Sequence, residues 1–386
     1  MRIALACLFL VSCSQPALQN NARFVEQLEE LPLEQRQSEV DSMWTSLPSL
    51  PLIESDSLAV FLFRSDSSAV SVVGDFSEWN PDLFPMSRLE GTDLWHREMS
   101  FESDARLDYQ FVVNKEHYTL DPANPEVMPG GFGSNSELSM PDYMQPEEIQ
   151  PQPGGVGGEL SEHSVSSTHL GSSRTVTIYT PPNYDASSDR VYGSLLLHDG
   201  SDYLRLGNMP AILDNLISSG RIEPLVAFFL DPADRMEEYA RSSNEAFVDF
   251  VIEEFVPWAE STYNISREPG RTAVTGISLG GNISAQLCNE HPEVFGLCAP
   301  LSTAFGVDRG ALLSRIADSG ESTVKYYVEW GTYEPPIARY APDFIAALEN
   351  NGNELLWNEW HEGHSWGMWR AHQDIILEYF FPANPR

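Results

Sequence analysis

The sequence predicts an α/β protein in which a small antiparallel β-sandwich precedes a mainly parallel sheet that helices cover on both faces. Two patterns support this fold class. In the first third of the chain, short runs of alternating apolar and polar residues are separated by clusters of Asp, Ser and Gly, which is typical of antiparallel strands. After residue 160, β-rich runs alternate with helical segments, and this order builds a parallel sheet.

Composition limits the functions open to the chain. The 386 residues include 57 Asp and Glu against 22 Lys and Arg, so the formal net charge is −35. Binding to phosphate backbones and anionic membrane faces rests on clustered cations, so we expect no nucleic-acid partner and no membrane binding through bulk charge. Hydrophobic residues make up 42 % of the chain, enough for packed cores, and at ~150 residues per domain two domains are expected.

The first residues predict export. An apolar run at 3–11 follows one Arg and is far shorter than the ~20 apolar residues that span a bilayer, which indicates a secretory signal. Residues 10–13, Leu-Val-Ser-Cys, resemble a bacterial lipoprotein signal. That resemblance implies removal of residues 1–12, a diacylglyceryl anchor on Cys13 and, because Ser14 follows, an outer-membrane lipoprotein on the periplasmic or surface face. An ordinary signal with an incidental Cys is the alternative.

Four regions are predicted after the signal. Residues 13–50 read as a polar helical spacer, 51–135 as the β-sandwich, 136–160 as a linker rich in Pro and Gly, and 161–386 as the main domain. Strands of the sandwich are expected at 58–64, 69–73, 95–100 and 107–113. In the main domain strands are expected at 175–179, 194–198, 225–230, 272–277, 324–330 and 355–359, and helices at 209–219, 245–262, 281–290, 338–350 and 366–380.

A candidate nucleophile lies between a predicted strand and a predicted helix. The sequence Gly-Ile-Ser-Leu-Gly-Gly at 276–281 places Ser278 in a strand-to-helix turn, the context that makes a GxSxG motif a nucleophile elbow. A Ser hydroxyl is a weak nucleophile, so it must stand on a tight turn where a base can reach it. The backbone N–H of Leu279 is the expected first donor to the oxyanion.

The base and the acid are expected late in the chain, since the order in such sites is Ser, acid, His. His364 is preferred to His361 because Gly363 precedes it in the loop after the last predicted strand. Glu334, in a loop after the strand at 324–330, is preferred as the acid to Glu329, which falls inside that strand.

Fewer residues are predicted for the rest of the site. A second oxyanion donor is expected from the amide of Ser201 or Asp202, because Gly200 lets that loop approach the site. The spacing of the late His residues is not the HExxH metal pattern, so no zinc site is expected from them. Cys288 and Cys298 are expected to be small buried hydrophobes.

Several stretches in the main domain resemble one family. LLLHDGSDY at 195–203, LDPADRMEEYARSSNEAFVDFVIEEFVPWAE at 230–260, GISLGG, GTYEPPIARY and GHSWGMWR together resemble the esterase D group, and within it the enterochelin (enterobactin) esterases. The resemblance covers roughly 165–382 and implies an α/β-hydrolase fold, a site of Ser278, Glu334 and His364, and hydrolysis of carboxylic esters without a metal or organic cofactor. Feruloyl and acetyl-xylan esterases are the alternative, and they usually carry Asp where this chain has Glu334. The substrate is thus a small-molecule or polysaccharide ester.

Substrate contacts are expected from four residues near these motifs, namely Tyr203, Arg339, Trp366 and Arg370. A ferric catecholate is strongly anionic while the chain carries −35, so a local basic patch would be needed. Its candidates are Arg205, Arg235, Arg241, Arg339 and Arg370. Structural pairing of Arg235 and Arg241 with acidic neighbours is the alternative.

The sandwich region resembles the isoamylase N-terminal, glycogen-binding type of module, an immunoglobulin-like (E-set) fold. The resemblance rests on VGDFSEW at 73–79, DLW at 93–95, YQFVV at 109–113 and LDPANP at 120–125. It implies glycan contacts by Trp79, Tyr118 and Asn135, while Trp79 as a core or interface residue is the preferred interpretation. A carbohydrate-binding lipoprotein with an inert hydrolase domain is a further alternative, and the oligomeric state is left open.

Overall fold

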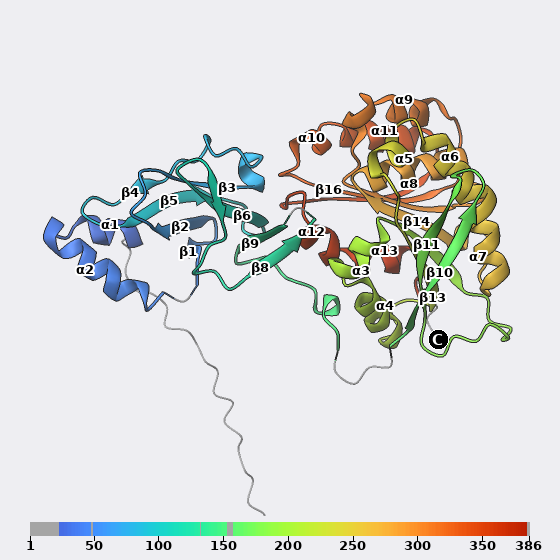
Figure 1. The fold of residues 1–386 in the computed structure, drawn as a ribbon, viewed down its shortest axis with the longest axis horizontal. Coiled ribbons are helices and arrows are strands. Elements are labelled where there is room, and N and C mark those ends of the chain that lie inside the picture. Colours follow the sequence, from blue (N-terminus) through green and yellow to red (C-terminus); the bar gives the residue numbers. More distant parts are fainter. Residues whose placement is uncertain (1–22, 48, 132, 153–156, 384–386) are drawn as a thin grey trace, which may run out of the picture.

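The computed structural model describes residues 23–47, 49–131, 133–152 and 157–383. The predicted signal and the anchor at Cys13 lie outside the described residues. A sandwich and a larger α/β domain lie against each other, with helix α12 (Trp366–Ala371) at the boundary between them (Figure 1). No helix in the described part of the chain is long and apolar enough to cross a bilayer.

Two antiparallel sheets form the sandwich. One has the order β1-β2-β5-β4 and the other the order β3-β6-β9-β8, with β7 paired to β6. The bounds are β1 Leu52–Ser55, β2 Leu58–Arg64, β3 Val70–Gly74, β4 Ser87–Arg88, β5 Leu94–Ser100, β6 Arg106–Val113, β7 His117–Thr119, β8 Val127–Gly130 and β9 Gly133–Ser139. Alternate side chains of β2 and β6 meet in an aromatic core in which the rings of Phe61 and Tyr109 lie 5.0 Å apart.

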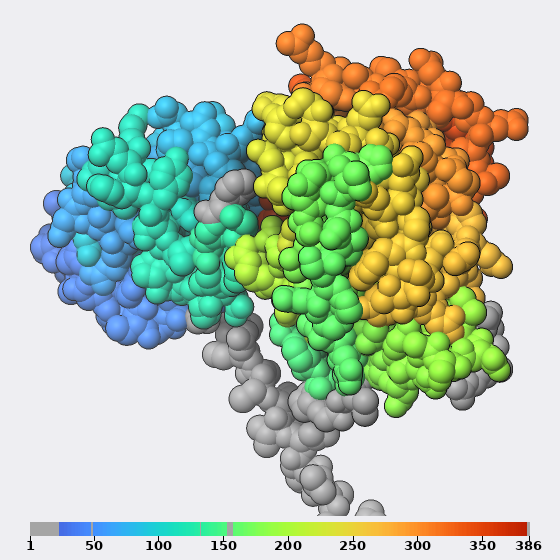
Figure 2. Space-filling view, turned by 45° about the vertical axis from the view of Figure 1, so that its right-hand side comes forward, coloured from blue at the N-terminus to red at the C-terminus, as the bar shows by residue number. Residues whose placement is uncertain are grey.

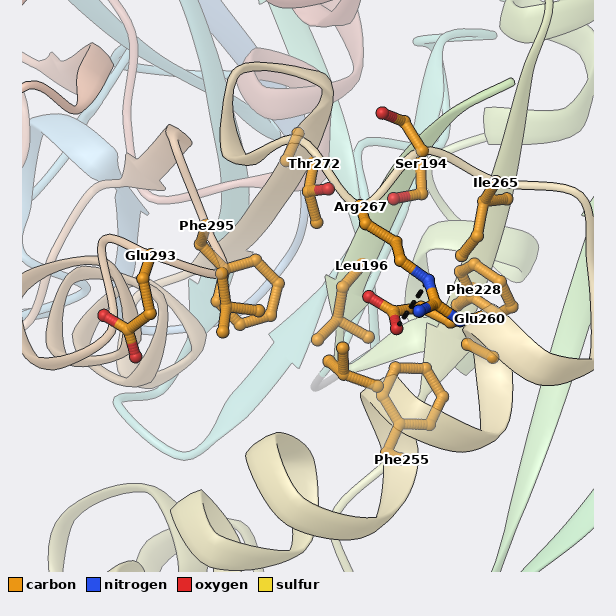
Figure 3. A pocket seen from close by; sticks show the side chains of 15 residues that line it. Ser194, Leu196, Phe228, Phe255, Glu260, Ile265, Arg267, Thr272, Glu293 and Phe295 are labelled. Atoms are coloured by element: carbon orange, nitrogen blue, oxygen red, sulfur yellow. Dashed lines mark ion pairs between the residues drawn. The ribbon is translucent and has the colours of Figure 1, made fainter. Parts of the chain in front are cut away.

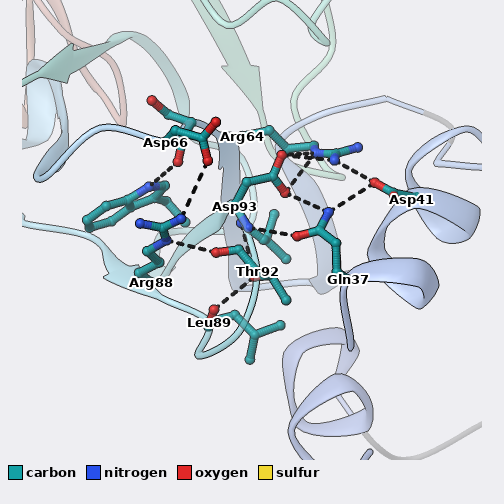
Figure 4. A network of polar contacts seen from close by, with 11 residues as sticks. Gln37, Asp41, Arg64, Asp66, Arg88, Leu89, Thr92 and Asp93 are labelled. Atoms are coloured by element: carbon teal, nitrogen blue, oxygen red, sulfur yellow. Dashed lines mark hydrogen bonds and ion pairs between the residues drawn. The ribbon is translucent and has the colours of Figure 1, made fainter. Parts of the chain in front are cut away.

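The segment expected to be a spacer packs on the sandwich instead. Helices α1 (Phe24–Glu29) and α2 (Leu33–Trp44) form there, and they bury Val25, Leu28 and Val40 in a cluster with apolar residues of β2. Polar contacts fix α2 further, because Arg64 bonds both Asp41 of the helix and Asp93 of the sandwich (Figure 4). Val40 is the buried residue of α2, and Met43 and Trp44 pack partly buried against the same cluster, so this part of the chain belongs to the sandwich domain.

The larger domain is built on an eight-stranded sheet of order β10-β11-β13-β12-β14-β15-β16-β17. Strands β10 and β11 form an antiparallel hairpin, β11 pairs antiparallel with β13, and the remaining pairs are parallel. The bounds are β10 Glu159–Ser167, β11 Ser172–Thr180, β12 Gly193–His198, β13 Leu225–Leu230, β14 Thr272–Ile277, β15 Leu297–Leu301, β16 Lys325–Gly331 and β17 Glu354–Trp360.

Helices cover both faces of this sheet. One face packs against α5 (Arg235–Ala240), α6 (Asn244–Asp249), α7 (Val256–Thr262), α8 (Leu279–Glu290), α9 (Ala311–Asp318) and α11 (Ala341–Asn350). The other packs against α3 (Gly200–Arg205), α4 (Met209–Ser218), α12 and α13 (Gln373–Phe380). A short helix α10 (Pro335–Ala338) follows β16. A π-helical turn at Phe250–Phe255 joins α6 to α7, so the helix predicted at 245–262 is interrupted.

The domain boundaries differ slightly from the prediction. Strand β9 carries the sandwich to Ser139, inside the predicted linker 136–160, and β10 already begins at Glu159. Ile149 of the connecting segment is buried in the core of the larger domain. The linker therefore packs partly against the domain that it precedes.

Candidate active site

Ser278 lies in a strained turn at the carboxyl end of β14. Its φ of 59° and ψ of −111° place it outside the usual regions, directly before α8. The turn is held from both sides, because the Ser278 N–H donates to the Leu301 carbonyl at 2.9 Å and its carbonyl accepts from Ala304 at 3.2 Å. A Cβ on Gly276 would lie 2.4 Å from the Gly280 carbonyl oxygen, so the turn requires glycine there. This is the geometry expected of a nucleophile elbow.

His364 and Glu334 meet in the loops that follow β17 and β16. The His364 Nδ1 forms a short hydrogen bond with Glu334 Oε1. The Glu334 side chain is 1 % exposed, while that of His364 is 42 % exposed. The other Glu334 oxygen accepts from the Gly331 N–H at 2.5 Å and from the Ser302 hydroxyl at 2.9 Å, so the carboxylate is fixed in place.

Glu329 has a different role from Glu334. Its Oε2 accepts from the Tyr327 hydroxyl at 2.8 Å and from the Trp360 indole at 3.1 Å, inside the core of the sheet. It also lies 3.5 Å from Nδ1 of His372, a buried residue stacked on Trp360. Of the two carboxylates considered from the sequence, the structure brings Glu334 to His364.

Residues 301–304 connect the Ser278 turn to the His364 loop. The Ser278 N–H donates to the Leu301 carbonyl, and Ser302 is the next residue along the chain. The Ser302 hydroxyl donates to Glu334 and accepts from the Trp369 indole N–H at 2.9 Å. The Trp369 ring in turn meets the His364 ring edge-on, with centroids 4.7 Å apart. Ser302 and Trp369 are supporting residues that sequence reasoning missed; no motif marks Ser302, and Trp369 lies in the stretch GHSWGMWR without any special spacing.

The predicted second oxyanion donors are engaged elsewhere in the structure. Helix α3 begins at Gly200, and the Asp202 N–H donates to the Asp199 carbonyl at 3.0 Å, so the prediction of a free amide in an open loop is wrong for Asp202. The Ser201 N–H donates to Asp231 Oδ1 at 3.0 Å and could reach an oxyanion only by exchanging that bond. The Leu279 N–H opens α8, where the first amides have no acceptor within the helix.

An ion pair lies beside the elbow, where Arg235 pairs structurally with a carboxylate, that of Asp199. The Arg235 Nε lies 2.9 Å from both oxygens of Asp199, and its Nη2 donates to the Ile277 carbonyl at 2.8 Å. A Cβ on Gly280 would lie 3.0 Å from the same carboxylate, so the pair lies against the start of α8. Burial raises the pKa of Asp199 to about 6 although Arg235 opposes the shift.

Two of the four residues expected to contact substrate belong to the core. Tyr203 is 0 % exposed with its hydroxyl 3.5 Å from Thr275 Oγ1, and Trp366 packs edge-on against it, so both expectations are wrong. The aromatic pair instead packs α3 against α12. Arg339 is exposed, and its guanidinium lies over the Tyr340 ring. Arg370 is half-buried, and among the described residues its buried Nε has no hydrogen-bond partner.

The other predicted arginines of the patch are paired. Arg205 lies 2.8 Å from Asp202, and Arg241 lies 3.7 Å from Glu237. With Arg235 on Asp199, three of the five candidates thus have carboxylate partners.

The predicted glycan residues lie around one sheet of the sandwich. Tyr118 on β7 is 51 % exposed, and Trp79 is half-buried after the turn that follows β3. Asn135 on β9 accepts from Gln110 at 2.9 Å and donates to Asp108 at 3.0 Å. Its amide is thus bonded within the sheet.

Cys288 and Cys298 are buried and free, as expected of small hydrophobes. A cavity of about 70 Å³ lies elsewhere in the domain, between the amino-terminal ends of β12 and β14 and helix α7 (Figure 3). The Arg267–Glu260 ion pair, 3.3 Å long, lies at its edge. Its position at the opposite end of the strands from Ser278 separates it from the site, because functional residues of such sheets gather at the carboxyl ends.

Each of the two domains matches a known family. The model of the Esterase family matches residues 167–378, and the model of carbohydrate-binding module 48, the isoamylase N-terminal domain, matches residues 51–123. The iron(III) enterobactin esterase of Dickeya dadantii is 24 % identical over 336 residues, which cover 74 % of this chain and 76 % of that protein.

Two solved structures extend this comparison. The enterobactin esterase of Shigella flexneri, solved in the presence of enterobactin, has a TM-score of 0.72 at 24 % identity and covers 88 % of this chain and 97 % of its own. A ferulic acid esterase of Anaeromyces mucronatus has a TM-score of 0.55 at 20 % identity, over 62 % and 96 % of the two chains. These likenesses confirm the fold, in which an isoamylase-type sandwich precedes an α/β-hydrolase domain in the sequence.

Proposed function

Because the chain belongs to the Esterase family and is a carboxylic ester hydrolase, we propose that Ser278, His364 and Glu334 are its catalytic triad. The observation that carries the proposal is the bond between the exposed imidazole of His364 and the buried carboxylate of Glu334. Both follow strands of the sheet whose β14 ends at Ser278. Such an arrangement orients one ring nitrogen and leaves the other, Nε2, to act on a Ser hydroxyl.

The reaction follows from these positions. The Ser278 hydroxyl attacks the ester carbonyl carbon while His364 Nε2 takes its proton, and the bonded Glu334 stabilises the imidazolium. The Leu279 N–H binds the oxygen that becomes negatively charged, and the same imidazolium then protonates the departing alcohol. Water attacks the acyl-Ser278 by the same route and releases the acid.

For the substrate we propose an ester of the enterobactin type, a catecholate lactone. Support comes from the two-domain likeness to the Shigella flexneri enterobactin esterase, which covers 97 % of that chain, sandwich included. Arg339 and Arg370 are the cations available for anionic groups, since the other arginines considered are paired with carboxylates.

A feruloyl ester is the second candidate substrate. It is favoured by the likeness of the hydrolase domain alone to the ferulic acid esterase of Anaeromyces mucronatus. A panel of a catecholate trilactone, methyl ferulate and acetylated xylan separates the two. Faster turnover of the trilactone supports the first candidate, and preference for methyl ferulate supports the second.

We further propose that the protein is exported and anchored in the outer membrane through Cys13. The support is the sequence Leu-Val-Ser-Cys at 10–13 behind a short apolar run. Metabolic labelling with an alkyne fatty acid tests this proposal, because label is expected on the full chain and not on the Cys13→Ser variant. Equal labelling of the two would contradict it.

The basic test of function uses a short p-nitrophenyl ester. Protein lacking residues 1–13 is expected to hydrolyse it, and the Ser278→Ala variant is not. Binding of glucan without any ester turnover by the whole protein would instead favour a non-catalytic, carbohydrate-binding role.

A further inference from the structure

We propose that the sandwich positions the catalytic triad, through a segment at 101–108 that contacts the loops carrying both His364 and Glu334. The proposal rests on the triad proposed above. In the space-filling view the two domains are in contact, with dark red residues of the C-terminal segment at the bottom of the hollow between them (Figure 2). The contacts at this boundary involve the triad loops in particular.

Three polar contacts join this segment to the His364 loop. The Arg106 N–H donates to the His361 carbonyl at 3.1 Å, in a parallel bridge between Arg106 and Glu362. The Asp104 carboxylate lies 2.6 Å from His361 Nδ1. The Arg106 Nη1 donates to the Ser365 hydroxyl at 2.8 Å. The loop is therefore bonded to the sandwich on both sides of His364 in the sequence, at His361 and at Ser365.

The Glu334 loop is held by the same segment. The Tyr333 hydroxyl, one residue before the acid, donates to Glu102 Oε2 at 2.7 Å. The Tyr333 ring lies 6.5 Å from that of Phe101. The Tyr333 N–H also donates to the Glu362 carbonyl at 3.2 Å, which joins the two triad loops to each other. One segment of the sandwich is thus bonded both to the loop that carries the acid and to the loop that carries the base.

The loop has glycines where the sandwich approaches most closely. A Cβ on Gly363 would lie 2.0 Å from Cγ of Asp75, and a Cβ on Gly367 would lie 2.0 Å from Cζ of Arg106. Both sandwich side chains are buried and cannot move aside. The two glycines on either side of His364 therefore allow the close approach on which the bonds depend.

Arg106 is itself rigid. Its side chain is 1 % exposed and lies 2.6 Å from Asp108 Oδ1 and 2.6 Å from Glu137 Oε2, both on the sandwich. A guanidinium fixed by the buried carboxylate of Asp108 and the half-buried one of Glu137 has a set orientation, and its Nη1 donates to Ser365. Arg106 and Glu102 are accordingly positioning residues, which act on the reaction through the two loops and touch no substrate.

The test removes one contact from each loop without removing Arg106, whose loss would leave the carboxylates of Asp108 and Glu137 without their cation. Ser365→Ala removes the acceptor of Arg106, and Tyr333→Phe removes the bond to Glu102. In the described chain the Ser365 hydroxyl makes no capping bond to α12, so the helix loses nothing by this change. Ser365→Thr restores the hydroxyl, and Tyr379→Phe is the matched control, because its hydroxyl bonds Glu354 at 3.2 Å far from the site.

Kinetics on the p-nitrophenyl ester and thermal melting are measured for each variant. We expect Ser365→Ala and Tyr333→Phe to lower kcat about tenfold with little change in KM or Tm, because small misplacements of catalytic groups are costly. Ser365→Thr should recover kcat, and Tyr379→Phe should match the wild type. Glu102→Gln combined with Tyr333→Phe should be no slower than Tyr333→Phe alone.

The outcomes separate this inference from the function. An active wild type whose Ser365→Ala and Tyr333→Phe variants keep the full kcat would overturn the positioning role alone. The same holds if kcat falls only in step with Tm and Ser365→Thr rescues neither. A wild-type protein without any ester turnover would instead overturn the proposed triad, and the inference with it.

Discussion

Nδ1 of His364 is bonded to a carboxylate, that of Glu334, which is almost completely buried, while the imidazole itself remains 42 % exposed. This difference in exposure gives the two residues different roles. The buried carboxylate is fixed by Gly331 and Ser302, so it can orient the ring. The imidazole itself stays accessible from solvent. A structural ion pair on the surface would not show this asymmetry.

Glu334→Gln is therefore expected to reduce kcat strongly with little effect on folding. Glutamine keeps the shape of the side chain but cannot stabilise the imidazolium, and losses of about 10²–10⁴ are typical of such a change. Steady-state kinetics on a p-nitrophenyl ester measure the effect. Glu329→Gln is the matched control: we expect a lower Tm because the bonds to Tyr327 and Trp360 weaken, with kcat retained. Equal kcat values for the two variants would contradict the assignment of Glu334.

The turn at Ser278 predicts that Gly276→Ala inactivates the enzyme. Its Cβ would lie 2.4 Å from the Gly280 carbonyl oxygen, so the elbow must shift and carry Ser278 with it. We expect kcat to fall by about 10²-fold or more. Gly270→Ala serves as the control, since its Cβ would meet no atom within 4 Å. Normal turnover by Gly276→Ala would show that the turn is not constrained as described.

The Arg235–Asp199 pair predicts a change in both stability and rate. Arg235→Lys keeps the charge but loses the planar group that bridges Asp199 and the Ile277 carbonyl. Because Arg235 is 40 % exposed, we expect a loss of only about 1 kcal/mol in the free energy of unfolding. Denaturant unfolding measures it, and kcat should fall as well since Ile277 precedes Ser278. An unchanged midpoint and an unchanged kcat would exclude a supporting role for the pair.

Asp199 and Glu362 should each make the folded protein less stable as the pH rises from about 4 to 7, while buried His198, whose pKa burial lowers to about 3, acts in the opposite direction. Burial raises the pKa of Asp199 from 3.8 to about 6 and that of Glu362 from 4.5 to about 7. In this interval the two carboxyls hold protons in the folded protein that they have released in the unfolded chain, so their titration favours unfolding as the pH rises. Urea unfolding at several pH values tests this, and Glu362→Gln should flatten the upper part of the decline. A Glu362→Gln variant with the same pH dependence of stability as the wild type would contradict it.

Local sequence patterns predict those parts of the proposed site that lie next to glycines and strand ends. Ser278 and His364 stand out because glycines and strand-to-loop boundaries surround them, and β13 and β14 begin and end at the predicted residues. Strand β15 was missed, since its short sequence LCAPL contains a proline.

Other features depend on tertiary packing and leave little trace in one sequence. The burial of Tyr203 and Trp366 follows from how α3 meets α12, although both residues adjoin motifs. Helix α3 was read as a loop because Asp-Gly-Ser-Asp is a turn-like stretch. The contact between Arg106 and Ser365 joins residues 259 positions apart in different domains, and no local pattern encodes it.

The most direct test of the central claim is covalent trapping of the nucleophile. The protein is treated with an alkyl fluorophosphonate, and the modified residue is located by mass spectrometry of its peptides. The account predicts one adduct per chain, on Ser278, formed together with loss of esterase activity and absent from Ser278→Ala. An adduct on another residue, or full ester hydrolysis by Ser278→Ala, would contradict it.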